Sequence, residues 1–368
     1  MFRLKTALVL ALVATLLLFS SLLTSGLADG GANHQVRNQH FGVSGGNVND
    51  ASTRFCCSGT LGSLVSIGGT QYILSNNHVL ARGDQAVAGE DVSQPGLIDN
   101  SCRIATIVAD FTAAAPLGSN VDAAVAQLRA GQMDSTGFIE DIGVPSGTIV
   151  NPSVGLGVAK SGRTTGFTTG TISSINTSVS VQYQRGCNGG KKFTVSYTNQ
   201  VVINSSTFSA GGDSGSLIVT NNASHSPVAL LFAGSSTSTI GNPIGEALTK
   251  LSTALGSAVS FSGSAGGNPN PKGRQADERQ PFIPGLEAVM PQLPQQAADR
   301  ALAVLEVHRA NLMFQPGVIG AGIGAGRTDA EAAIVIYVNK NAEQRPILPD
   351  NIDGIPLTVV LTDQFIAF

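Results

Sequence analysis

The residues best suited to chemistry lie in a stretch of small residues at 209–216, Ser-Ala-Gly-Gly-Asp-Ser-Gly-Ser. Near its centre, Ser214 follows Asp213 and precedes Gly215, so a tight turn could present its hydroxyl group. A serine hydroxyl is a poor nucleophile until a neighbouring base accepts its proton. We therefore expect a histidine and an orienting carboxylate from elsewhere in the chain to complete a site around Ser214.

Two upstream segments supply these partners. His78 stands in Ser-Asn-Asn-His-Val-Leu, and Asp122 stands in Asn-Val-Asp-Ala-Ala. Asp91 and Asp110 rival Asp122 on spacing alone, but the apolar residues after Asp122 continue a strand that would bury its carboxylate. The order His, Asp, Ser is that of the chymotrypsin-type triad, so His78 is the predicted base and Asp122 its orienting acid.

These segments, with Ser-Gly-Arg-Thr-Thr-Gly-Phe at 161–167, resemble those of the trypsin-like (chymotrypsin-fold) serine proteases. The segment at 161–167 is similar to the corresponding segment of secreted bacterial members such as α-lytic protease and the streptogrisins. Leu-Ser-Asn-Asn-His-Val-Leu at 74–80, Gln-Pro-Gly at 94–96 and Leu-Phe-Ala-Gly at 231–234 also resemble the bacterial and plant narrow-leaf type group.

This resemblance spans residues 52–262 and implies a mainly β fold with two antiparallel β-barrels. His78 and Asp122 would belong to the first barrel and Ser214 to the second, with the active site between them. The implied activity is hydrolysis of peptide bonds in polypeptide substrates through an acyl-enzyme on Ser214.

The same resemblance assigns supporting residues. The backbone N–H groups of Gly212 and Ser214 would form the oxyanion hole, where glycine lets the backbone turn inward. Asp213 needs a counter-charge if it is buried, and the resemblance to α-lytic protease implies a pair between Arg163 and Asp213. The substrate-binding positions are Phe208, Ala210, Phe232, Ala233 and Gly234.

Two positions depart from the family pattern. Ser216 stands where glycine is usual, and Phe232 stands where many members carry a serine that supports the triad aspartate. The residue six positions before Ser214 is Phe208 and not an aspartate, so nothing supports a preference for Lys or Arg. An apolar or small substrate side chain is the expectation.

Composition limits the partners and the location. The 368 residues are 42% hydrophobic and 12% charged with a net charge of −3, so no nucleic-acid partner is expected. Arg3 and Lys5 precede an apolar run at 7–23, and cleavage after Ala28 would complete a signal peptide. The protein is then secreted or periplasmic with no stable membrane association; an uncleaved anchor is the alternative. No cofactor and no metal site are expected.

Four cysteines, Cys56, Cys57, Cys102 and Cys187, could oxidise after export and lack metal-ligand spacing. Three full pairings are open, although the neighbours Cys56 and Cys57 should not bridge each other. Buried free thiols or a structural disulfide remain the alternatives.

The chain length suits two domains. After a signal peptide at 1–28, we expect an N-terminal arm at 29–51, the protease domain at 52–262, a linker at 263–282 and a small α/β module at 283–368. Within the module, the pattern predicts a helix over 294–311 and strands at 318–323, 333–338 and 357–361. The module could contact the protease domain, and assisting folding, occluding the cleft and binding substrate or cell wall are its open roles.

The rival function is a secreted binding or scaffold protein that keeps a protease fold with little or no turnover. An α/β-hydrolase is disfavoured because its acid and histidine should follow the nucleophile, and because Ser216 occupies a position that needs glycine.

Overall fold

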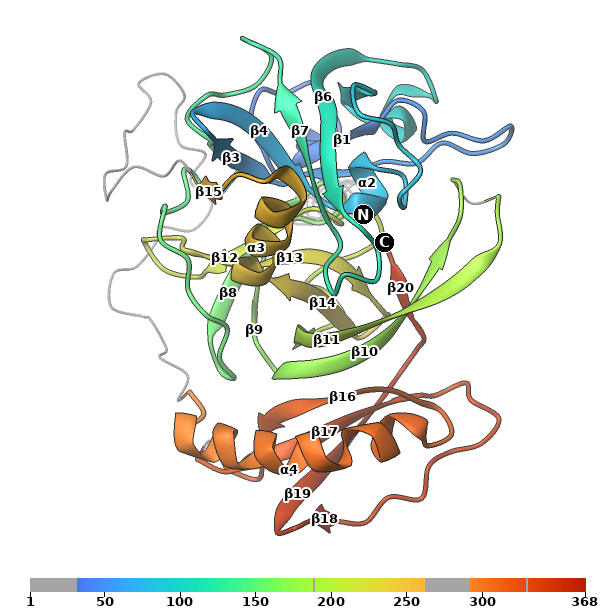
Figure 1. Ribbon diagram of the computed structural model, residues 1–368, viewed down its shortest axis with the longest axis vertical. Helices are drawn as coiled ribbons and strands as arrows, with labels where there is room; N and C mark the ends of the chain where they lie inside the picture. Colours follow the sequence, from blue (N-terminus) through green and yellow to red (C-terminus); the bar gives the residue numbers. More distant parts are fainter. Residues whose placement is uncertain (1–31, 188, 262–291, 329) are drawn as a thin grey trace, which may run out of the picture. The chain divides into compact units, whose positions relative to one another are not determined.

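A computed structural model describes residues 32–187, 189–261, 292–328 and 330–368. The predicted signal peptide and the linker 263–282 lie outside these residues. The described chain is mainly β, with two barrel-like, largely antiparallel sheets and few helices, which confirms the predicted fold class (Figure 1).

The first sheet carries the strands on either side of His78 and Asp122. Its strands, in spatial order, are β15 (Val259–Phe261), β3 (Ser63–Ile67), β4 (Thr70–Ser75), β7 (Ala123–Leu128), β6 (Thr106–Ala115), β5 (Asp91–Gln94), β1 (Val43–Asn47) and β2 (Gly59–Leu61). Helix α3 (Ile244–Leu255) packs on this sheet through an apolar face spaced at helical intervals, formed by Ile244, Ala247, Leu248 and Leu251. Two short helical turns, α2 (Asn77–Leu80) and η2 (Leu97–Asn100), lie in its connections.

The N-terminal boundary differs from the expected arm at 29–51. After the 3-10 turn η1 (Ala32–His34), β1 lies inside the first sheet, paired with β2 and β5, and all of its residues are buried. The Gly-rich sequence of β1 gave no strand signal because its small residues serve packing. A Cβ at Gly45 would lie 2.4 Å from Leu61 Cγ, so the glycine makes room for a core leucine. The first sheet therefore begins before residue 52.

The second sheet carries Ser214 in the turn that leads into one of its inner strands, and it continues into the C-terminal module. Its first strands, in spatial order, are β9 (Gly166–Thr171), β8 (Gly157–Gly162), β12 (Leu217–Thr220), β13 (Pro227–Gly234), β14 (Ser238–Pro243), β11 (Lys192–Asn204) and β10 (Ser174–Gln184). The hairpin predicted around the Gln184–Lys191 turn is present as β10 and β11.

The C-terminal module contains the predicted helix, α4 (Gln295–Phe314), and the three predicted strands. These are β16 (Val318–Ala325), β17 (Ala332–Asn339) and β19 (Ile355–Thr362), with the short β18 (Asn351–Ile352) beside β19. Antiparallel pairing of β16 with β10 joins the module to the second sheet. Tyr337 of β17 shares a core with Tyr197 and Phe232, so the module packs as part of the same unit as the barrel.

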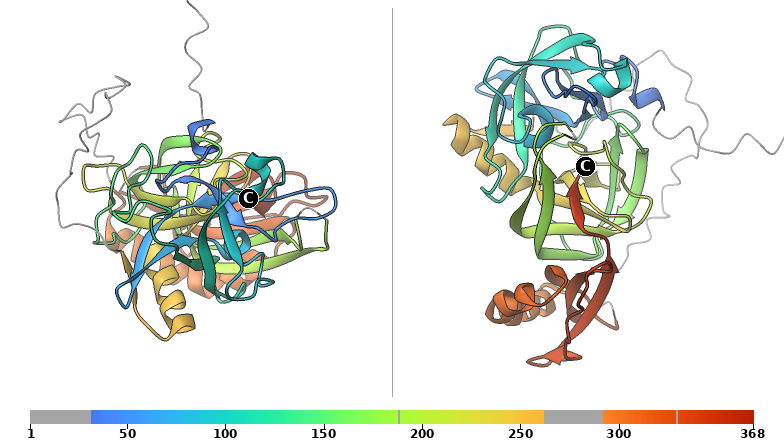
Figure 2. Two further views of the ribbon diagram at one scale, coloured as in Figure 1. Left: turned by 90° about the horizontal axis from the view of Figure 1, so that it is seen from above. Right: turned by 90° about the vertical axis from the view of Figure 1, so that its right-hand side faces the viewer.

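The last strand, β20 (Phe365–Ala367), leaves the module and runs to the place where the two sheets meet. It is the red segment that ends near the C label in Figure 1 and in the right-hand view of Figure 2. It pairs in parallel with β10 and in antiparallel fashion with β13.

Two disulfides show how the four cysteines pair. Cys56 bonds Cys102 and Cys57 bonds Cys187, so neighbouring cysteines join different partners. The second bond ties the segment before β2 to the β10–β11 turn of the other sheet.

Candidate active site

The pairing of β4 with β7 brings His78 and Asp122 together. Its register places Ser75 opposite Ala124. Because the strands are antiparallel, the residues after Ser75 and those before Ala124 leave the sheet at the same end. His78 lies there on α2, and Asp122 faces it from the start of β7, fully buried.

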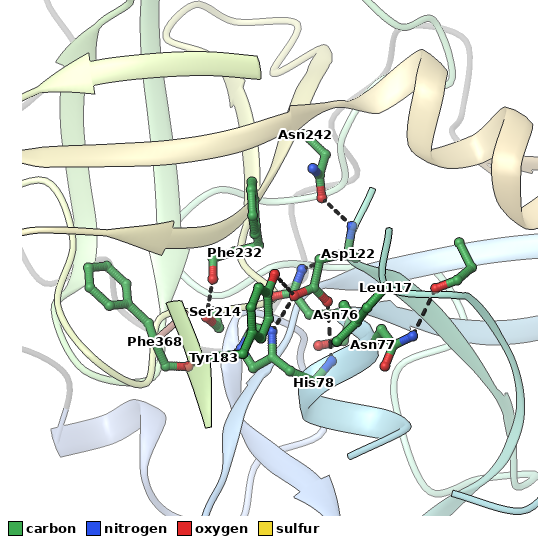
Figure 3. Close-up of polar contacts among 12 residues, drawn as sticks. Asn76, Asn77, His78, Leu117, Asp122, Tyr183, Ser214, Phe232, Asn242 and Phe368 are labelled. Carbon is green, nitrogen blue, oxygen red and sulfur yellow. Dashed lines mark hydrogen bonds and ion pairs between the residues drawn. The ribbon is translucent and has the colours of Figure 1, made fainter. Parts of the chain in front are cut away.

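Asp122 holds His78 by its ring and by its backbone. Nδ1 of His78 lies 2.6 Å from Oδ2 of Asp122, and the backbone N–H of His78 donates to Oδ1 at 3.2 Å (Figure 3). Burial alone would lower the pKa of His78. The charge and hydrogen bond of Asp122, together with a hydrogen bond to Phe368 and the charge of Asp50, outweigh it, so the pKa is raised. The carboxylate thus fixes the ring's orientation and favours the imidazolium.

A tyrosine pair completes the surroundings of Asp122. The hydroxyl of Tyr183 donates to Oδ2 of Asp122 at 2.8 Å and lies 2.6 Å from the hydroxyl of Tyr197. Burial and then the negative charge of Asp122 raise the pKa of Tyr183 well above its ordinary value, so it remains a donor. Tyr183 therefore gives Asp122 a hydroxyl donor, which Phe232 cannot supply. Sequence reasoning missed it, and its only signal was a tyrosine on the predicted hairpin.

Ser214 lies in a tight turn that packs on the other sheet. Gly212 and Gly215 adopt positive φ angles of 98° and 96°, which glycine tolerates. A Cβ at Gly215 would lie 2.2 Å from both Ser75 Oγ and the carbonyl oxygen of Thr60. The backbone N–H of Thr60 donates to the Ser214 carbonyl at 2.7 Å. The turn is therefore pressed against the strands that lead to His78.

In this structure Ser214 and His78 each bond to a backbone carbonyl. Oγ of Ser214 donates to the carbonyl of Phe232 at 3.1 Å, and Nε2 of His78 lies 3.0 Å from the carbonyl oxygen of Phe368 (Figure 3). Ser214 is fully buried. The predicted His–Asp contact is thus present, while the serine hydroxyl and the ring are engaged with other groups.

The backbone at the predicted oxyanion hole has unpaired donors. No residue that the structure describes accepts a hydrogen bond from the backbone N–H of Gly212 or of Ser214. The carbonyl of Gly212 instead accepts from Oγ1 of Thr60 at 2.9 Å, which holds this peptide in place. Such donors can serve a developing negative charge on an incoming carbonyl.

The predicted ion pair between Arg163 and Asp213 is wrong. Arg163 forms a two-pronged pair with Asp99 on η2, with Nε–Oδ2 and Nη2–Oδ1 distances both of 2.6 Å. The counter-charge of Asp213 is Lys160, whose Nζ lies 3.5 Å from Oδ2 with both side chains fully buried. Lys160 lies within β8 and points into the core, whereas Arg163 lies in the turn between β8 and β9 and reaches Asp99.

Asp213 is also held by backbone and hydroxyl donors. Its carboxylate accepts from the N–H groups of Thr164 at 2.8 Å and Ala210 at 2.9 Å, and from Oγ1 of Thr165 at 2.7 Å. Burial lowers the pKa of Lys160, and the charge of Asp213 opposes that shift. The tip of the hairpin and Lys160 together fix the residue before Ser214.

The predicted substrate-binding residues differ in their contacts. Phe208 is fully buried in the second-sheet core, so it forms the base of this region and not an open wall. Ala210 binds Asp213 through its backbone. Phe232 packs its ring on Tyr197 with centroids 5.0 Å apart and turns its carbonyl to Ser214. Ala233 and Gly234 pair with β20.

A cleft opens beside His78 on the side of the disulfides. Its lining includes Asp50, Cys57, His78, Phe193 and Phe368. Burial raises the pKa of Asp50 to about 6, against the opposing charges of His78 and Arg82. Asp50 is thus a second carboxyl group, besides Asp122, that interacts electrostatically with His78. Sequence reasoning placed Asp50 in the arm and gave it no role.

The described residues lack two further kinds of feature. They contain no cluster of three or more His, Cys, Asp or Glu side chains that could hold a metal ion. None of their helices has the length and apolar character needed to cross a membrane.

Comparisons with known proteins find only distant similarity. No protein-family model matches the sequence, and no curated protein does. Among solved structures, a glutamic acid specific serine protease is 21% identical with a TM-score of 0.42, covering 60% of this chain and 98% of its own. An α-lytic protease homologue (N4) is 18% identical with a TM-score of 0.39, covering 61% and 98%. Nocardiopsis protease is 15% identical with a TM-score of 0.38, covering 55% and 92%.

Proposed function

We propose that this protein is a secreted serine endopeptidase. The observation that carries the proposal is the contact of His78 with a buried Asp122, beside a glycine turn that presents Ser214 and two unpaired backbone N–H groups. Each group has a role in acyl transfer, and the arrangement needs no metal or cofactor. Two disulfides and the predicted signal peptide support export.

The chemistry follows from the positions of the groups. When a substrate carbonyl replaces the present contacts, Nε2 of His78 takes the proton of Ser214 as Oγ attacks the carbonyl carbon. The oxyanion that forms accepts from the N–H groups of Gly212 and Ser214, and removing one such donor typically costs about 10²–10³ in kcat. His78 then gives its proton to the leaving amine, which leaves an acyl group on Ser214 for water to remove.

Asp122 has two tasks in this scheme. Its hydrogen bond to Nδ1 keeps Nε2 directed at the serine, and its charge stabilises the imidazolium formed in each proton transfer. The hydroxyl of Tyr183 and the backbone of His78 stabilise the carboxylate in its ionised form. Because a hydroxyl group can only donate a hydrogen bond to an ionised carboxylate, Tyr183 remains the donor and Asp122 the acceptor throughout the reaction.

A fluorophosphonate probe tests the proposal, because it forms a covalent bond only with an activated serine. We expect purified protein without residues 366–368 to be labelled at Ser214, and the matched Ser214→Ala variant to be unlabelled. Ser216→Ala is the control, because Oγ of Ser216 donates to the backbone carbonyl of Asp213 and faces no histidine. Absence of Ser214-dependent labelling in a folded protein refutes the proposal.

One observation favours the rival function of a binding or scaffold protein. In this structure Ser214 and His78 are both bonded to backbone carbonyls and Ser214 is buried. If folded protein lacking 366–368 remains unlabelled and cleaves no peptide, that rival is the better description.

A further inference from the structure

The strand β20 lies along the part of β13 that a substrate backbone would use, if the proposed function holds. Its register places Ala367 opposite Ala233 and Ile366 opposite Gly234 in antiparallel pairing. The N–H of Phe368 then points to the carbonyl of Phe232 at 3.4 Å. A peptide bound for cleavage pairs with a protein strand through the same kind of backbone contacts.

Phe368 brings its carbonyl group to the candidate catalytic residues. Its carbonyl oxygen lies 3.0 Å from Nε2 of His78, and Ser214 beside it is fully buried. In the proposed mechanism, this ring nitrogen is the one that accepts the proton of Ser214. The last described residue therefore occupies the nitrogen of His78 that catalysis needs and not only the edge of the cleft.

The ring of Phe368 fills a space that exists because residue 234 has no side chain. A Cβ on Gly234 would lie 2.5 Å from Cζ of Phe368. The ring also packs against the apolar core that contains Phe208. The site therefore accepts a large flat apolar side chain at the residue that carries the reacting carbonyl.

β20 is fixed in the cleft by contacts outside the cleft. Phe365 is fully buried in the core shared with the module, with its ring centroid 5.7 Å from that of Tyr337. Nε2 of Gln364 donates to the carbonyl of Ser180 at 3.0 Å. Because the strand is tethered next to its binding place, its effective concentration far exceeds that of a free peptide.

The two contacts of the His78 ring define its charge in this arrangement. Nδ1 faces a carboxylate oxygen of Asp122 and Nε2 faces a carbonyl oxygen of Phe368. Both oxygens only accept hydrogen bonds, so both ring nitrogens must donate. The ring is therefore the imidazolium, which has no lone pair to accept a proton from Ser214.

We propose that β20 and Phe368 are an intramolecular inhibitor that occupies the acyl side of the substrate cleft, and that the cleft selects an aromatic or large apolar residue immediately before the scissile bond. The inference rests on the proposed function and names its substrate class and its regulation. Displacement of β20 by a substrate, or its release from the cleft, is then a condition for turnover.

The experiment compares the full chain with two variants, one lacking residues 366–368 and one carrying Phe368→Ala. Both keep Phe365, the buried anchor of the strand. We expect labelling of Ser214 by the fluorophosphonate to be at least about tenfold faster in both, because docking of β20 reduces the competent fraction in the full chain. A synthetic peptide of residues 364–368 should slow labelling of the shortened variant again.

Leu361→Ser is the matched control. Leu361 is a half-exposed apolar residue of β19, so its replacement should leave the labelling rate of the full chain unchanged. Thermal melting of every variant shows whether it is folded.

Peptide ester substrates that differ only in the residue before the cleaved bond test the substrate class. We expect the shortened variant to prefer Phe over Lys and over Glu by at least about tenfold in kcat/KM, since each 1.4 kcal/mol of transition-state binding is worth that factor. Equal or better turnover of the Lys or Glu ester overturns the specificity.

The possible failures are distinguishable. Equal labelling rates for the full chain and both variants overturn the inhibitory role of β20 and leave the peptidase standing. No Ser214 labelling in any folded variant overturns the proposed function, and the inference with it.

Discussion

The buried pair of Lys160 and Asp213 gives a prediction that can be worked out from distances. Nζ of Lys160 lies 3.5 Å from Oδ2 of Asp213, and neither side chain is exposed. Nζ also donates to the carbonyl of Gly166 at 2.8 Å. Replacing Lys160 with Met keeps much of the apolar stem and removes the charge, so Asp213 keeps its backbone donors but loses its counter-ion.

The expected loss follows from the charge separation. At an effective dielectric constant of about 20, unit charges at this distance attract by about 5 kcal/mol. Removing one partner of a buried pair typically costs about 3–5 kcal/mol. Because the entropy of unfolding grows with chain length, each kcal/mol lowers Tm by roughly 1–2 °C in a chain of this size, so Lys160→Met should lower Tm by about 5 °C.

A double-mutant cycle isolates the pair from other effects of each substitution. Tm and urea midpoints are measured for Lys160→Met, Asp213→Asn and the double variant, and the expected coupling is about 2–4 kcal/mol in favour of the pair. The matched cycle with Arg163→Met and Asp213→Asn should give a coupling below about 0.5 kcal/mol, because Arg163 binds Asp99. A larger coupling to Arg163 than to Lys160 refutes the assignment.

Three further predictions concern Asp122, β20 and the disulfides. Tyr183→Phe removes a donor from the Asp122 carboxylate, worth about 1.5–3 kcal/mol for a charged acceptor, so kcat of the shortened protein should fall roughly 10- to 100-fold while KM changes little; an unchanged kcat in steady-state assays contradicts this role. The hydrogen bond from Nε2 of His78 to the Phe368 carbonyl raises the pKa of the ring, so docking of β20 through this bond takes up a proton. Docking is then complete below the pKa of the free histidine and is lost as pH rises through the docked pKa. The labelling rate of the full chain relative to the shortened protein should therefore increase with pH, with Asp50, whose pKa is about 6, as the other titrating group near the ring; a flat ratio from pH 5 to pH 9 would be inconsistent. Replacing Cys57 and Cys187 with Ala opens a loop with a sequence separation of 130 and should cost about 2–5 kcal/mol in urea unfolding, whereas an unchanged midpoint would show that the bond adds no stability.

Much of the site could be predicted from short segments. The turn around Ser214 needs glycines with positive φ, and residues 212 and 215 supply them. The pairing of β4 with β7 follows from two apolar runs that flank His78 and Asp122, so the contact of these two side chains was foreseeable. The helix and three strands of the C-terminal module also followed from apolar spacing. The catalytic roles of these residues stay predictions.

Other features depend on residues that meet only through packing. Lys160 and Arg163 are both cations near one hairpin, and only the direction in which each side chain leaves that hairpin decides which of them reaches Asp213. Tyr183 of β10 meets Asp122 of the first sheet although 61 residues separate them in the chain. No local pattern encodes either choice.

The sequence by itself determined the local structure of this protein, namely its strands, glycine turns and helices. The patterns that form them act between residues that are near neighbours in the chain. The tertiary structure alone decided the partner of Asp213, the tyrosine beside Asp122 and the arrival of Phe368 at His78. The separation between residues 78 and 368 in the chain is 290 positions, and only sheet register and a shared core bring them within 3.0 Å.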